Sequence, residues 1–219
     1  MRVARIQIIL FLVMLSLCCG RTTFATPVSY TDSTNFMNDL PSTASVLNFD
    51  VLTGGDIIND GDTLDGITFA YNFDGVKMMV SNFEDTTSPD NFLGTNDGDI
   101  FQGGDNFSLS FASSNAIGMY FITTDELEDV DITLAAGGGS VGLDATAYST
   151  LSDGSYVFFL GIIDSVNTFT TASVTTSGPF FLYNVDDIVT SSPIPEPQTF
   201  VLFVSGLVAL AGVGRKRRK

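Results

Sequence analysis

Histidine is absent from all 219 residues of the chain. The chain therefore lacks the side chain that serves most often as a general base and as a metal ligand. A Gly-x-Ser-x-Gly match occurs at 138–142, centred on Ser140. A catalytic serine in such a motif needs a histidine partner and a strand-to-helix turn. We therefore interpret this stretch as a flexible glycine loop between two strands.

Only two cysteines are present, Cys18 and Cys19, and both fall within an N-terminal targeting segment. Two arginines in the first five residues precede an almost wholly apolar run, 6–19, and then the stretch TTFATP. This order is typical of a secretory signal peptide, and we expect cleavage between Ala25 and Thr26. The exported chain then has neither a disulfide nor a thiolate, and its partners during export are the Sec translocon and signal peptidase.

Basic residues are scarce, with nine Lys and Arg against 25 Asp and Glu. Lys77 is the only basic residue between positions 26 and 196, where all the acidic residues lie, so this part has a formal charge of −24 rather than the −16 of the whole chain. Such a surface repels nucleic acid and anionic lipid, so we expect no nucleic-acid partner. It also destabilises the fold unless cations or salt screen the carboxylates.

The C-terminus has three parts in a fixed order. An extended Pro-Glu-Pro motif is followed by an uncharged apolar run, 200–214, and then by a basic cluster. The run of 15 residues would form a helix about 22 Å long, enough for a stop-transfer segment but short for a permanent anchor. The basic cluster should stay cytoplasmic. The residues of the motif and of the cluster are Pro195, Glu196, Pro197, Arg215, Lys216, Arg217, Arg218 and Lys219.

This ordered tail, 193–219, resembles the PEP-CTERM sorting signal of Gram-negative bacteria. In that family, exosortase, a membrane-bound cysteine-type transpeptidase, recognises the tail, cuts at the motif and releases or re-attaches the protein. The resemblance implies three segments: a linker with the motif at 193–199, a transmembrane helix at 200–214 and a basic tail at 215–219. It also implies an inner-membrane intermediate and a final location at the cell surface or in the extracellular matrix. A plain tail anchor is the alternative.

The segment between the two ends, 26–192, has the length of one domain. Short β-branched and aromatic stretches (SLSF, VKMMV, VDITL, LDATAYS, SYVFFLGII) alternate with glycine- and aspartate-rich turns. We count about ten strands with no helical crossover, which predicts an all-β fold: an antiparallel β-sandwich, jelly-roll-like in topology. The phrase VLNFD…GITF loosely resembles the start of β-sandwich ectodomains that are common on PEP-CTERM proteins.

One short helix is expected at 33–40, STNFMNDL, with Ser33 or Thr34 as its N-cap. Phe36 and Leu40 are four residues apart and would share one face of this helix. The apolar run FFLGII, 158–163, is typical of a strand buried on both faces.

Two acidic loops, 56–66 and 95–105, combine several carboxylates with glycines. Calcium prefers six to eight oxygen ligands, which loops of this kind can supply. The preferred interpretation is solvated turns, and a calcium site with Asp60 and Asp62, or Asp97 and Asp99, as ligands is left open. No EF-hand is matched, and no other cofactor is expected.

A hydrolase that uses only carboxylates would need two acids, and four glutamates are present: Glu84, Glu126, Glu128 and Glu196. None lies in a distinctive motif, and tryptophan, which often stacks on sugars, is absent. We therefore expect no enzyme.

The sequence thus favours an exported, exosortase-sorted structural protein of the cell surface or of an exopolysaccharide-rich, biofilm-associated matrix. The alternative is a carbohydrate-binding or adhesion β-sandwich module, calcium-dependent in one version, with exopolysaccharide as its partner.

Overall fold

Two antiparallel β-sheets make up most of the protein. The computed structural model describes residues 26–178 and 181–192, in which sixteen strands and one short helix occur. The predicted signal peptide, 1–25, and the predicted sorting tail, 193–219, lie outside the described residues. Within the described residues, no helix is both long enough and apolar enough to cross a membrane.

The larger sheet has ten strands. Seven lie in the order β1-β14-β10-β16-β7-β6-β3, while β13 pairs with β14, and β2 and β8 pair with β16. The ten strands are β1 (Val28–Tyr30), β2 (Ala44–Leu47), β3 (Ile57–Ile58), β6 (Met78–Ser81), β7 (Phe92–Thr95), β8 (Phe101–Gln102), β10 (Ala116–Thr123), β13 (Tyr148–Thr150), β14 (Tyr156–Ile163) and β16 (Leu182–Ser191).

The smaller sheet has six strands in the order β12-β11-β15-β9-β5-β4. They are β4 (Thr63–Leu64), β5 (Ile67–Tyr71), β9 (Phe107–Ser114), β11 (Ile132–Ala136), β12 (Gly139–Gly142) and β15 (Phe169–Thr176). In β5, β9 and β11, buried apolar residues alternate with more exposed small ones, as expected where one face packs on a core and the other meets water.

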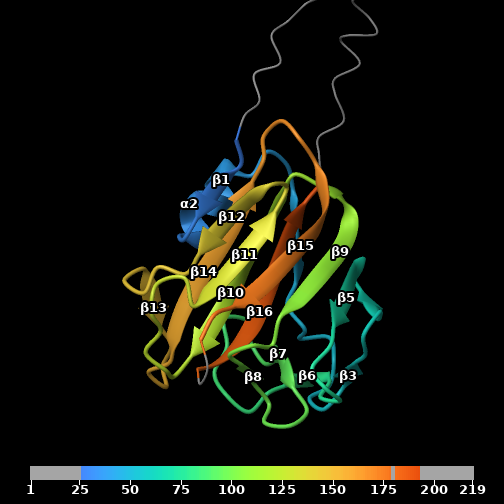
Figure 1. Ribbon diagram of the computed structural model, residues 1–219, viewed down its shortest axis with the longest axis vertical. Helices are drawn as coiled ribbons and strands as arrows, with labels where there is room; N and C mark the ends of the chain where they lie inside the picture. Colours follow the sequence, from blue (N-terminus) through green and yellow to red (C-terminus); the bar gives the residue numbers. More distant parts are fainter. Residues whose placement is uncertain (1–25, 179–180, 193–219) are drawn as a thin grey trace, which may run out of the picture.

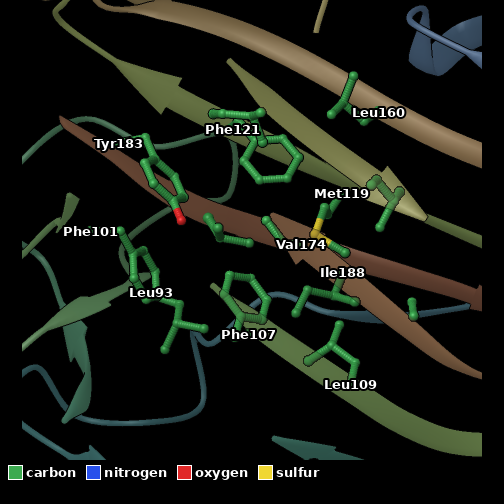
Figure 2. Close-up of a cluster of buried hydrophobic side chains, with 14 of the residues drawn as sticks. Leu93, Phe101, Phe107, Leu109, Met119, Phe121, Leu160, Val174, Tyr183 and Ile188 are labelled. Carbon is green, nitrogen blue, oxygen red and sulfur yellow. The ribbon is translucent and has the colours of Figure 1, made fainter. Parts of the chain in front are cut away.

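The two sheets pack face to face, with most of the apolar core between them (Figure 1). Met119 and Phe121 of β10 meet Leu109 of β9 and Val174 of β15 across this core (Figure 2). Tyr183 is fully buried in the same cluster, and its hydroxyl donates to the carbonyl of Asp105 at 3.0 Å. The all-β, antiparallel, two-sheet architecture is therefore as predicted.

The chain changes sheets repeatedly in its second half. Strands β10, β14 and β16 belong to the larger sheet, whereas β9, β11, β12 and β15 belong to the smaller one. In chain order the path crosses between sheets at every step from β9 to β11 and again from β14 to β16. The central strands of each sheet are therefore not neighbours in sequence.

The helix α2 (Ser33–Asp39) covers part of the outer face of the larger sheet. Its buried residue, Phe36, packs against Phe159 of β14 in a second apolar cluster. This cover explains why β14 is buried on both faces, as the FFLGII run predicted. The N-cap is Asp32, which accepts a hydrogen bond from the backbone N–H of Asn35 at 2.7 Å, so the prediction of Ser33 or Thr34 was wrong.

Three other predictions need correction. The count of about ten strands is too low. Strands of only two residues, such as β3, β4 and β8, are too short to show an alternation of apolar and polar residues in the sequence. Of the stretch LDATAYS, only Tyr148 and Ser149 lie in a strand, since Asp144 instead accepts turn bonds from Thr146. The stretch 138–142 is not a loop: Gly139–Gly142 is β12, which pairs with β11 through a turn at Gly137 and Gly138.

Candidate functional site

A hollow opens beside the short strand β13, which extends the larger sheet beyond β14. Figure 1 shows β13 at one margin of the sandwich. Its volume is about 250 Å³. We call it the tyrosine pocket, and its lining residues are Asp125, Glu126, Leu127, Ala145, Tyr148, Tyr156 and Phe158.

Two tyrosines form one wall of the tyrosine pocket. Tyr148 lies opposite Phe158 in the β13–β14 register, so both side chains project from the same face of the sheet. The Tyr148 ring meets the Tyr156 ring edge to face, with centroids 4.9 Å apart and planes at 84°. Tyr148 remains 50% exposed. An aromatic surface is therefore held rigidly at the mouth of the pocket, open to solvent.

The turn before β13 positions Tyr148. Asp144 accepts hydrogen bonds from the backbone N–H of Thr146 at 2.9 Å and from its hydroxyl at 2.7 Å. These bonds hold the pKa of Asp144 below its ordinary value. Asp129 anchors the same turn by accepting the backbone N–H of Ala145 at 2.9 Å. The local sequence thus forms a compact turn that places Tyr148 at the edge of the sheet.

Two carboxylates, those of Asp125 and Glu126, also line the tyrosine pocket. Asp125 accepts the backbone N–H of Leu182 at 2.7 Å, which ties the loop after β10 to the start of β16. Glu126 is exposed. Lys77, the only basic side chain among residues 26–178 and 181–192, is bonded through Nζ to Asn59 at 3.0 Å and is not part of this pocket. The pocket therefore combines apolar ring surface with negative charge.

A second, larger hollow of about 630 Å³ is almost entirely polar. It contains four carboxylates and no aromatic side chain; its lining is Asp50, Leu52, Thr53, Gly54, Asn82, Glu84, Asp85, Thr86, Pro89, Asp90, Asn91, Leu151 and Ser152. Burial raises the pKa of Glu84, and the nearby charges of Asp153 and Asp99 raise it further. Because it offers no ring for stacking, this hollow is the weaker candidate for binding a sugar.

The wall of this polar hollow is anchored to a bulge in β16. The β10–β16 register shifts between Gly118 and Tyr120, and Asp187 adopts a positive φ of 50° at that point. The carboxylate of the adjacent Asp186 accepts hydrogen bonds from the hydroxyls of Thr86 and Thr87 and from the backbone N–H of Ser88. One buried carboxylate thus holds the segment 86–88 against the sheet.

The four calcium candidates already accept hydrogen bonds from other groups of the protein. Asp60 accepts the backbone N–H of Tyr71 at 3.0 Å. Asp62 accepts the backbone and side-chain N–H groups of Asn59 at 2.7 and 3.0 Å, which hold its pKa below the ordinary value. Asp97 accepts a hydrogen bond from the hydroxyl of Thr95 at 2.7 Å, and Asp99 accepts one from the hydroxyl of Ser81 at 3.1 Å.

Lys77 links the two acidic loops. Its backbone N–H donates to Asn96 at 2.9 Å, and its ammonium group donates to Asn59 at 3.0 Å. In the part of the chain that the structure describes, no group of three or more histidine, cysteine or acidic side chains is placed to hold a metal ion. The calcium site stays a prediction, to be tested by titration.

The outer face of the smaller sheet is built from small side chains. Serine, threonine, alanine and glycine fill its outward positions: Thr68, Ala70, Ser108, Ser110, Thr133, Ala135, Ser140, Gly142, Thr171, Ser173 and Thr175. Ser140 of the Gly-x-Ser-x-Gly match lies here, in a hairpin rather than at a strand-to-helix turn. A hollow of about 570 Å³ lies over this face, but it has neither a ring nor a charge.

Sequence analysis missed the tyrosine pocket. Glu126 was considered only as a hydrolytic acid, and Tyr148 only as part of a strand. A usable signal was present in the Asp-x-Thr turn before Tyr148, because such a turn places the following aromatic residue at the start of a strand, where it is exposed. The proximity of Asp125 and Glu126 to Tyr148 depends on tertiary contacts that no local pattern encodes.

No family model and no curated protein matches the chain. Among solved structures, the CBM22-1 xylan-binding domain from Paenibacillus barcinonensis Xyn10C is similar, with 16% sequence identity and a TM-score of 0.36. The match covers 65% of this chain and 99% of that one. A score this low carries no argument about fold or function.

Proposed function

We propose that the protein is an exported, non-catalytic polysaccharide-binding module of the cell surface or extracellular matrix. The observation that carries this proposal is the tyrosine pocket, where half-exposed Tyr148 stands beside Tyr156 and Glu126. Sugar rings have apolar C–H faces and polar rims, so a site for them needs ring surface next to hydrogen-bond acceptors. The tyrosine pocket offers both. A neighbouring hollow of about 390 Å³ shares Tyr148 and is also lined by Tyr120, Phe159 and Asp32, so the aromatic surface continues beyond the pocket. The two other hollows described above lack an aromatic ring.

We also infer a jelly-roll topology. Four strands of the larger sheet lie in the order β14-β10-β16-β7, and four of the smaller sheet lie in the order β12-β11-β15-β9. Taken in chain order from β7 through β9, β10, β11, β12, β14 and β15 to β16, these eight strands produce two interleaved Greek keys. Loops at the margins of such a sandwich are free to form binding sites.

The route to the outside is proposed from the two chain ends. The signal-peptide pattern with a cleavage site between Ala25 and Thr26 supports export, and the ordered C-terminal tail supports sorting by an exosortase-like enzyme at Pro195–Pro197. In a host that carries such an enzyme, mass spectrometry of the mature protein should show that 215–219 has been removed. An intact basic tail would favour a plain membrane anchor instead.

Binding can be tested with the full chain purified in a mild detergent. Affinity electrophoresis in gels that contain neutral, amino-bearing or acidic polysaccharides should show retardation in at least one of them. Tyr148→Ala should weaken that binding by about tenfold or more, equivalent to about 1.4 kcal/mol, because stacking surface is lost. The matched control is Phe83→Ala, since Phe83 is 80% exposed and lies outside the pocket. Unretarded migration in every gel would reject the proposed function.

A further inference from the structure

We propose that the tyrosine pocket binds a single ring of a polysaccharide chain, and that this ring is a hexosamine with a free, protonated amino group. This inference rests on the proposed function and names the ligand of the same site. Three features of the pocket carry it: its size and floor, its charge, and the position of the carboxylates relative to the rings.

The size of the pocket limits how much of a chain it can hold. At about 250 Å³ it is smaller than the roughly 300–1,000 Å³ typical of sites for drug-sized ligands. Its floor includes Leu127 and Phe158, which are 7% and 3% exposed and belong to the main core. A chain cannot pass through that core, so the pocket fits about one ring and the rest of the chain lies outside it.

The charge of the pocket selects among sugars. Asp125 and Glu126 are both ionisable acids, and the pocket contains no basic side chain to neutralise them. The wider domain increases the negative potential, because Lys77 is the only base in its described residues. A uronic acid would bring a third negative charge into this site, whereas an ammonium group would be attracted to it.

The tyrosines strengthen the same preference. A cation close to the face of a tyrosine ring is attracted by the ring quadrupole, and Tyr148 is open to solvent on its exposed side. Because Asp125 already accepts the backbone N–H of Leu182, Glu126 is the better partner for an incoming ammonium group. A hexosamine can stack its ring on Tyr148 while its amino group pairs with Glu126.

Isothermal titration calorimetry on the full chain at about pH 6, where an aliphatic amine is protonated, tests this inference. The probes are glucosamine oligomers, their N-acetylated counterparts and galacturonate oligomers. We expect the free-amine oligomers to bind at least about tenfold more tightly than the acetylated ones, and the galacturonates to bind least. The preference should weaken as salt rises from about 50 to about 500 mM. A dimer should bind nearly as tightly as a hexamer, because only one ring is held.

Two variants separate charge from fold. Glu126→Gln should abolish the preference for the free amine while keeping the weaker binding of the acetylated oligomer. Glu128→Gln, two residues along the same exposed loop and outside the pocket, should change neither. Tyr148→Phe should retain binding of both oligomers, and Tyr148→Ala should lose it.

The outcomes distinguish this inference from the proposed function. If the acetylated or the acidic oligomers bind as well as the free-amine ones, or if affinity keeps rising with chain length, the inference is wrong and the proposed function stands. A lysine tripeptide that bound as tightly as the sugar would also overturn the inference, by showing that the pocket detects charge alone. Failure of all the sugars to bind would overturn both.

Discussion

Asp187 shows how the backbone of one residue sets the chemistry of a carboxyl group. At the bulge in β16, Asp187 adopts a positive φ of 50°, and it directly follows Asp186 in the chain. Burial first, and then the charge of Asp186, raise the pKa of Asp187 from its ordinary 3.8 to about 6. The hydroxyl of Thr87 acts in the opposite direction but does not cancel these effects. Asp187 is therefore half-ionised close to pH 6 in the native state.

The raised pKa has a definite consequence for stability. Between about pH 4 and about pH 6, Asp187 is protonated in the native state but has already lost its proton in the unfolded chain. The stability that this proton contributes is therefore complete below about pH 4, and it is lost as the pH rises through 6. Asp187→Asn removes this loss and keeps a residue type that tolerates positive φ. We expect the variant to be more stable than the wild type above pH 7 by roughly 1 kcal/mol, a value discounted because the side chain is partly solvated.

Thermal melts of both proteins from pH 4 to pH 8 check this prediction. The two melting temperatures should converge at about pH 4, separate between about pH 4 and about pH 6, and differ by a constant amount above about pH 7. Asp90→Asn, an exposed position at the rim of the polar hollow, serves as the control for removing one negative charge. If Asp187→Asn and Asp90→Asn give the same pH profile, general charge repulsion accounts for the effect and the bulge does not.

Residues such as Asp186 and Asp187 lie beyond local sequence analysis. The pattern LYNVDDIVTS contains two adjacent acids in an otherwise apolar strand, which suggests at most an irregularity. Three of the donors that Asp186 binds come from 86–88, about 100 positions earlier in the chain. The burial that raises both pKa values arises from those distant contacts, so the residue type was visible in the sequence and its role was not.

At the level of elements, the helix α2 is docked by one aromatic ring over two glycines. Phe36 lies above Gly161 of β14 and Gly118 of β10, which face each other in the register. A Cβ atom added at Gly161 would stand 2.6 Å from Cδ2 of Phe36 and 2.8 Å from Cε1 of Phe159. Real Cβ atoms do not approach other atoms so closely, so these glycines create the space into which the helix packs.

Gly161→Ala should therefore destabilise the protein by about 1–3 kcal/mol, because the packed rings must move. Chemical denaturation measures the loss. Gly98→Ala provides the control, since a Cβ there meets no atom within 4 Å and should change stability by less than about 0.5 kcal/mol. Phe36→Leu combined with Gly161→Ala should cost less than the sum of the two single variants. Strict additivity of the two losses would show that Phe36 and Gly161 do not interact.

Helices and strands with a clear pattern of apolar residues were predicted from the sequence, and those without such a pattern were not. The apolar run of β14 and the alternation of β9 and β11 reflect burial that each strand encodes by itself. The helix was correct within one or two residues, and Phe36 was correctly expected on its buried face. β12 was missed because GSVG has glycine at both ends, and only pairing with β11 makes it a strand.

Across the whole molecule, the negative charge is concentrated in loops. Of the sixteen strands in the described residues, β16 alone contains acidic residues, Asp186 and Asp187. Apart from Asp39 at the end of α2, the other carboxylates of the described residues lie in turns and loops, where many accept backbone N–H groups, as Asp62 and Asp144 do. This distribution keeps charge out of the sheets but crowds it at their margins, as the raised pKa of Glu84 beside Asp153 and Asp99 shows.

The last prediction concerns the response of the folded protein to salt. With a single lysine among residues 26–196, the carboxylates depend on solution cations for neutralisation. Two like charges 4 Å apart repel by about 1 kcal/mol in water, and salt at about 0.15 M screens charges beyond about 8 Å. The melting temperature should therefore rise as sodium or potassium chloride increases from about 10 mM to about 0.5 M, and the two salts should act equally.

A calcium site would produce a different response. Millimolar calcium would stabilise the native state by RT ln(1 + [L]/Kd), far beyond its contribution to ionic strength, and magnesium would be a poor substitute. Because Asp60, Asp62, Asp97 and Asp99 already accept hydrogen bonds within the protein, we expect calcium to act only as a screening ion. Equal melting temperatures in calcium and sodium chloride at matched ionic strength would confirm this. A specific rise with calcium, removed by Asp97→Asn with Asp99→Asn, would instead place a metal site in the loop after β7.

A melting temperature that no salt alters would mean that the carboxylates are too far apart to interact, and the electrostatic argument would be wrong.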